Sequence, residues 1–143
     1  MVSLVGARRE ALAQAEPEMF APSGDAPQLT EAFFSALIDQ KTAITLVCET
    51  GGEVSGLAIA CVQAPPPVYA PAEPVYLLDD LAISADASWD KEGEALIHAV
   101  EDAARGHGAS SILAVCPFCD EGALLALAAS GHRPVSQWSR KDL

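Results

Sequence analysis

Basic residues and cysteines are scarce in this chain, and each shortage excludes classes of protein. Eight lysines and arginines stand against twenty aspartates and glutamates in 143 residues, a formal charge of −12. A field of that sign repels nucleic acid and anionic membrane surfaces, so we expect neither as a partner. It favours a cationic ligand, such as a small or peptidic amine. Four cysteines are too few for a disulfide scaffold in a chain of this length.

Two features that mark exported and membrane proteins are also lacking. The first residues do not combine a basic start with an apolar run, so no secretory signal is predicted and we expect a cytoplasmic protein. The longest uncharged stretch, residues 54–72, contains four prolines, which favours a strand followed by a loop over a membrane span. Half of the residues are apolar, enough to predict one packed domain over residues 1–143.

Apolar periodicity and turn residues predict a series of helices and strands. Gly51 and Gly52 lie between two apolar runs, as in a tight hairpin whose turn needs positive φ, and such a turn would pair Cys48 with Ser55. Asp120 is a good helix N-cap. The predicted order is helices 3–15 and 30–40, strands 44–49, 54–62 and 75–83, helix 89–105, strand 111–116, helix 120–130 and strand 135–139. This order implies an α/β (α+β) sandwich, in which a mixed, mostly antiparallel sheet is flanked by helices.

The segment with the most chemistry runs over residues 76–93. An apolar strand carries two adjacent carboxylates, Asp79 and Asp80, and a turn then leads into a helix start, where an anion could bind. Because adjacent strand residues point to opposite faces, only one of the two carboxylates would face a given cleft. Either one could be functional.

In layout this segment resembles the acetyl-CoA site of the GNAT N-acetyltransferases. The family signature Arg/Gln-x-x-Gly-x-Gly/Ala aligns with residues 88–93, where the last glycine is kept as Gly93. Residues 52–56 resemble the family's hairpin, residues 78–83 its acidic and then apolar strand, and residues 120–135 its last helix and ending, so that the resemblance covers residues 16–142. The family's fold opens with a strand before the first helix. That strand is missing here, which leaves a sheet edge at which a homodimer could form.

The resemblance implies transfer of an acetyl group from acetyl-CoA to an amine. Asp79 or Asp80 would be the base or the anchor of the substrate. The strand backbone would bind pantetheine, and amides at the helix start would bind the pyrophosphate. The implied cofactor contacts are Leu81, Ala82 and Ile83 for pantetheine, and Ser88, Trp89, Asp90, Lys91, Glu92 and Gly93 for the pyrophosphate.

The sequence departs from the family at three positions. Ser88 stands where the family has arginine or glutamine, Lys91 where it has a glycine, and Leu127 where it has the tyrosine acid. Residues 84–106 also hold six acidic and two basic side chains, so the helix start carries its own anions. The alternative is therefore a catalytically inactive GNAT-like binding or dimerisation module that no longer binds CoA. In that case Trp89 would pack into the groove that the cofactor vacated.

Cys116 and Cys119 form a second candidate site, with two residues between them. They follow a predicted strand and precede a helix, a setting that stabilises a thiolate and suggests a thiol oxidoreductase with a lowered thiol pKa. The plainer interpretation is two small residues at a buried strand end. A zinc site would need a second pair of ligands, and the three histidines are singly placed, so no metal is predicted.

Overall fold

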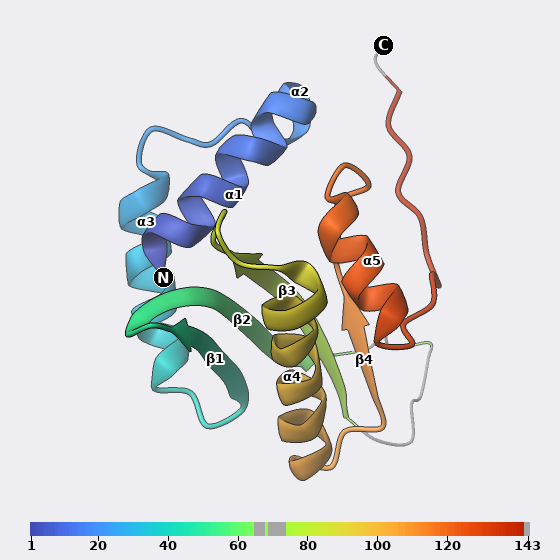
Figure 1. Cartoon of the computed structure of the whole chain (residues 1–143). Coiled ribbons are helices and arrows are strands. Elements are labelled where there is room, and N and C mark those ends of the chain that lie inside the picture. The colour runs from blue at the N-terminus through green and yellow to red at the C-terminus, as the bar shows by residue number, and fades with distance from the viewer. Residues whose placement is uncertain (65–67, 69–73, 142–143) are drawn as a thin grey trace.

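A computed structural model describes residues 1–64, 68 and 74–141 and forms a mixed sheet of four strands between helices (Figure 1). The predicted sandwich is therefore confirmed. The elements are α1 (Val2–Ala15), α2 (Pro17–Phe20), α3 (Ala26–Ile38), β1 (Ala43–Thr50), β2 (Glu53–Gln63), β3 (Val75–Ile83), the π-helix η1 (Trp89–Gly93), α4 (Glu94–Gly106), β4 (Ser111–Ala114) and α5 (Glu121–Ala129). Within the described ranges, the sheet begins with β1, after three helices, and no helix is long and apolar enough to cross a membrane.

The β1–β2 hairpin forms at the predicted glycines, but its register differs by one residue. Gly51 and Gly52 have φ of 65° and 87°, values that favour glycine and close a tight turn. A β-bulge next to Cys48 places this residue opposite Gly56. The expected pairing of Cys48 with Ser55 is therefore wrong, because the bulge adds one residue to a strand.

Two apolar layers cover the two faces of the sheet. On one face α1 and α3 bury Val5, Phe34 and Leu37 against residues of β2 and β3. On the other face α4 and α5 pack over the sheet, as Figure 1 shows for the two helices in front of β3 and β4. This second core includes Ile44, Ala58, Ala60, Tyr76, Leu78, Leu81, Leu96, Ile97, Val100, Ala104, Ala126 and Leu127.

Strands β3 and β4 run parallel, and all of β4 pairs with the first half of β3. The register runs from Val75 opposite Ser111 to Leu78 opposite Ala114, and the Val115 amide donates to the Leu78 carbonyl at 3.0 Å. β3 continues to Ile83, with β2 on one side and no pairing to β4 in the described residues. The two strands therefore part after Leu78, and the second half of β3 has a free backbone edge.

Two predicted elements differ from the structure. The helix expected over residues 89–105 begins as the π-helix η1, in which the Gly93 amide donates to the Ser88 carbonyl at 3.3 Å. The strand expected over residues 135–139 is wrong, because residues 132–141 are irregular and pair with no strand in the described part of the chain. An alternating pattern makes a strand only where a neighbour supplies backbone partners. Most of the proline-rich loop over residues 64–74 lies outside the described residues.

Candidate functional site

The two candidate carboxylates lie where β3 and β4 part, and a β-bulge sets their directions. Ile59 of β2 pairs with Asp80 and Ala60 pairs with Leu78, so Asp79 is the extra residue. Leu78 belongs to the core under α4, whereas Ala82 belongs to the core under α1. Because side chains alternate along a strand, Asp80 lies on the α1 face together with Ala82.

Asp80 is the carboxylate with the perturbed environment. Burial raises the pKa of Asp80, and the nearby charge of Asp79 raises it further, while Arg9 and Arg8 of α1 act in the opposite direction. Asp79 itself is exposed. A carboxylate with a raised pKa holds a proton more readily, so Asp80 is the better candidate for a general base.

Arg8 connects α1 to the start of α5 next to this carboxylate. Its Nε donates to Oδ2 of Asp120 at 3.0 Å, and the two side chains are only 16% and 14% exposed. The other carboxylate oxygen of Asp120 accepts from the Ala123 amide at 3.4 Å, so the predicted N-cap is confirmed. The sequence analysis missed Arg8, because 112 residues separate the partners and no local pattern joins them.

The helix start at Ser88–Gly93 is satisfied by its own side chains. The Ser88 amide donates to Oε2 of Glu92 at 3.0 Å, and the Ser88 hydroxyl donates to Asp90. Hydrogen bonds from the Ser88 amide and from its own amide lower the pKa of Glu92, so its carboxylate stays charged. The Lys91 and Gly93 amides both donate to the Ser88 carbonyl, at 3.2 and 3.3 Å. Most of the amides that a pyrophosphate would use already have acceptors.

Trp89 fills the space between η1 and α5. A Cβ atom built at either Gly93 or Gly122 would overlap its indole ring, so both positions require glycine for this packing. The ring also packs against the core under α4 and α5. The glycine kept from the family signature, Gly93, thus accommodates a tryptophan ring in this structure.

The structure brings most of the predicted cofactor residues to one end of the sheet. Leu81 and Ala82 are buried and Ile83 is half-buried on the free half of β3, and η1 packs on β3 and on α5. The backbone edge of residues 79–83 thus lies near the segment 88–93. The two parts differ chemically, since the strand edge is open and the helix start is self-capped.

Cys116 is not an activated thiol. Burial, and after it the charge of Asp120, raise the pKa of Cys116 to about 11. Its Sγ donates weakly to the carbonyls of Pro117 and Asp120, at 3.7 and 3.8 Å. The lowered thiol pKa expected for an oxidoreductase is therefore wrong, because apolar burial opposes the thiolate more than the helix start favours it.

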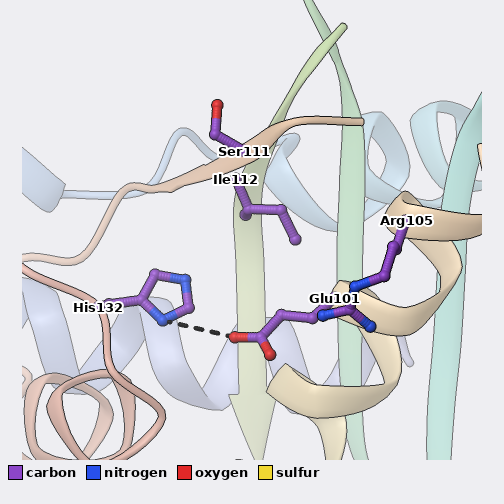
Figure 2. Close-up of a pocket in the computed structure, with 5 residues that line it drawn as sticks. All are labelled: Glu101, Arg105, Ser111, Ile112 and His132. Carbon is purple, nitrogen blue, oxygen red and sulfur yellow. Dashed lines mark ion pairs between the residues drawn. The ribbon is translucent and has the colours of Figure 1, made fainter. Parts of the chain in front are cut away.

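A separate cavity of about 180 Å³ lies at the beginning of β4. Figure 2 shows the imidazole of His132 directed toward the carboxylate of Glu101, with Nδ1 and Oε1 3.7 Å apart. Ser111 and Ile112, which also line this cavity, pair with the first residues of β3. The cavity is thus remote from Asp80 and shares no residue with the predicted site.

Comparisons with known proteins identify the fold. No family model matches the sequence, and no curated protein matches it. Among solved structures, a mutant of the BH1408 protein from Bacillus halodurans is 16% identical, covers 99% of this chain and 90% of its own, and has a TM-score of 0.86. A putative acetyl transferase from Pyrococcus furiosus is 19% identical over 99% and 92% of the two chains, with a TM-score of 0.70. An aminoglycoside acetyltransferase from an uncultured soil metagenomic sample is 18% identical over 78% and 72%, with a TM-score of 0.62. The chain therefore has the fold of the GNAT acetyltransferases.

Proposed function

We propose that this protein transfers an acetyl group from acetyl-CoA to a small or peptidic amine, with Asp80 as the base. The observation that carries the proposal is the position of Asp80, a half-buried carboxylate with a raised pKa where β3 and β4 part. Burying a carboxylate costs stability, and carboxylates perturbed in this way are concentrated at functional sites. The resemblance in fold to acetyltransferases supports the same chemistry.

The side chains around Asp80 suit an amine acceptor. An alkylamine reaches the site as an ammonium ion and must lose one proton before its lone pair can react. Asp80 accepts that proton, while the exposed carboxylate of Asp79 attracts the positive charge. Acetyl-CoA supplies the thioester that the free amine attacks. No acid is assigned for the leaving thiolate, since Leu127 stands at the family's tyrosine position and is buried in the core.

The residues fit only part of acetyl-CoA as they stand. The free edge of β3 at Leu81, Ala82 and Ile83 offers backbone groups of the kind that pair with the amides of pantetheine. The helix start does not fit the pyrophosphate, because the Glu92 carboxylate holds the Ser88 amide. We therefore assign the pantetheine contacts to β3 and no step to the phosphate groups.

A second candidate function is a binding or dimerisation module that does not bind CoA. The self-capped helix start and the Trp89 ring between Gly93 and Gly122 favour it. β1 pairs only with β2 and ends the sheet within the described residues, and an edge of this kind can pair with a second copy of the chain.

Calorimetric titration of acetyl-CoA into the protein separates the two functions. The transferase requires binding at micromolar to low millimolar cofactor, and a Gly93→Trp variant, whose added ring cannot share the space of Trp89, should lose that binding. Absence of heat and of thermal stabilisation at millimolar acetyl-CoA would reject the transferase in favour of the module. Measurement at low and at moderate salt controls for the charge of −12, which disfavours a polyanionic ligand.

A further inference from the structure

A cavity of about 310 Å³ lies between α1, the loop after α2 and α3, on the face of the sheet that Asp80 shares. Pockets that hold small molecules begin at about this size. Figure 1 shows α1 and α3 together, on the side of the sheet away from α4 and α5. The residues that line the cavity are Arg9, Ser23, Ala26, Leu29, Thr30 and Phe33.

Arg9 is the charged group of this cavity, and its partner is neutral. The guanidinium of this half-buried residue donates to the Thr30 hydroxyl, which itself donates to the Ala26 carbonyl at 2.7 Å. Among the described residues no carboxylate lies within ion-pair distance of Arg9. By contrast, Arg8 pairs with Asp120, and Arg105 pairs with Asp102. In a chain with twenty acidic residues, a half-buried guanidinium that makes no direct ion pair in the described residues can still donate to an anion from outside.

Part of the cavity wall, at Ala26, Leu29 and Phe33, is apolar. Leu29 and Phe33 lie on α3 and are 57% and 52% exposed. Phe34 and Leu37 of the same helix are buried, so the exposed pair covers a second face of α3. A ligand here would therefore combine an apolar group with an anionic one.

The cavity is electrostatically linked to the candidate base. The charge of Arg9 lowers the pKa of Asp80, in opposition to burial and to Asp79, so the guanidinium lies within effective range of that carboxylate. A ligand whose anion pairs with Arg9 would then serve as the acceptor if its ammonium group reached Asp80. An apolar amino acid has this distribution of charge.

We infer that the acceptor is an amine that also carries a carboxylate, an apolar amino acid or a peptide ending in one, whose carboxylate pairs with Arg9. The guanidinium fork matches a carboxylate in a bidentate pair, which gives direction as well as affinity. This inference deepens the proposed function and depends on it for the transfer step. Binding in the cavity does not depend on acetyl-CoA and is tested without it.

Two probes that differ only in the carboxylate test the inference. L-phenylalanine and L-phenylalaninamide are titrated into the full chain by calorimetry or by NMR shift mapping, in the absence of acetyl-CoA. We expect L-phenylalanine to bind at least about ten times more tightly than the amide. An Arg9→Gln variant should lose this preference. Arg105→Gln, which removes an equal charge from an exposed arginine on α4, should keep it.

Equal binding of the two probes, no binding of either, or an unchanged preference in Arg9→Gln would overturn the inference. The comparison of probes in the natural sequence needs no variant, so a misfolded Arg9→Gln protein does not prevent a decision. The result of this binding test is also independent of the result of the acetyl-CoA titration that tests the proposed function. If the chain prefers L-phenylalanine but does not bind acetyl-CoA, the carboxylate site at Arg9 is supported and the proposed acetyl transfer is rejected.

Discussion

The two ends of the candidate site differ in whether their charged groups already have partners. At the α1 end Asp80 is half-buried beside a second carboxylate, and the guanidinium of Arg9 donates to a hydroxyl rather than directly to a carboxylate. At the α4 end Glu92 and Asp90 satisfy the helix start from within the chain. Asp79, Asp80 and Arg9 thus form no direct ion pair among the described residues and can still bind a ligand, whereas the α4 end is closed by its own side chains.

This difference has a simple physical origin. A helix start is a positive pole with free amides, and acidic residues in its first turn stabilise it by roughly 0.3–1 kcal/mol each. An anionic cofactor must displace them. For Asp80 on β3, burial and the charge of Asp79 outweigh the opposing charges of Arg9 and Arg8, so its pKa is raised. The acidic residues of the helix start at the α4 end therefore stabilise the fold, whereas the charged Asp80 at the α1 end destabilises it.

The largest expected effect comes from Asp80→Asn, which removes the unbalanced charge. Loss of a general base lowers kcat/KM by about 10²–10⁴-fold, so acetyl transfer should fall by that factor in a steady-state assay. Asp79→Asn, the exposed neighbour, should reduce the rate much less. Equal losses in the two variants would show that the charge of the pair, rather than proton transfer to Asp80, carries the rate.

The Asp80→Asn variant should also be more stable than the natural chain at neutral pH. Because folding raises the pKa of Asp80, the folded state holds this proton more tightly than the unfolded chain. The charged Asp80 therefore destabilises the folded state fully when the pH is above its folded-state pKa. This destabilisation disappears as the pH falls below the pKa of Asp80 in the unfolded chain. In thermal unfolding, Asp80→Asn should have a higher Tm than the natural chain at pH 7 and the same Tm in acid. A lower Tm at pH 7 would contradict this assignment.

The closed end is tested by Gly122→Ala. A methyl group at this position would overlap the Trp89 ring, so the variant must displace the ring or the helix, and overpacking of this kind costs about 1–3 kcal/mol. Gly6→Ala, in an open position on α1, is the matched control and should gain roughly 0.5–1 kcal/mol. Denaturant unfolding measures both. An unaffected Gly122→Ala protein would mean that Trp89 does not hold this end closed.

The Glu92 cap should make stability depend on pH in the direction opposite to Asp80. The folded state lowers the pKa of Glu92, so its contribution is present above the unfolded pKa and is lost as the pH falls through the folded value. Glu92→Gln should therefore unfold at a lower temperature than the natural chain at pH 7, and at the same temperature in acid. A difference that persists in acid would assign the effect to packing rather than to the charged cap.

The smallest effect is expected from the paired variant Cys116→Ser, Cys119→Ser. With a pKa of about 11, the Cys116 thiol stays protonated at neutral pH and is a poor nucleophile. Acetyl transfer should not change, and the Tm of the natural chain should be the same with and without reductant. Fast alkylation of Cys116 at pH 7, or a reversible disulfide with Cys119, would restore the redox hypothesis.

Local features of this fold could be predicted from sequence, and long-range ones could not. The strand over residues 75–83, the Gly51-Gly52 turn and the Asp120 cap each depend on a few neighbouring residues, and all three are confirmed. The strand over residues 135–139 is wrong because its local pattern could not supply a neighbouring strand.

The candidate site was harder to predict because its geometry arises between elements. The bulge that turns Asp80 toward α1 depends on the register with β2, which sequence periodicity does not fix. Arg8 and Arg9 reach the site only because α1 packs on β3. Acidic residues at the helix start were visible in the sequence, but their hydrogen bonds to the Ser88 amide and hydroxyl were not.

The most direct test of the difference between the two ends is a titration of acetyl-CoA into the natural chain and into Glu92→Gln under identical conditions. A neutral side chain competes less well for the Ser88 amide, so the account predicts tighter acetyl-CoA binding in the variant. Glu94→Gln removes the same charge two residues later in the chain, without a hydrogen bond to the Ser88 amide, and is the control. Equal affinities in Glu92→Gln and Glu94→Gln, or weaker binding in Glu92→Gln, would contradict the claim that this end of the site is closed by its own carboxylate.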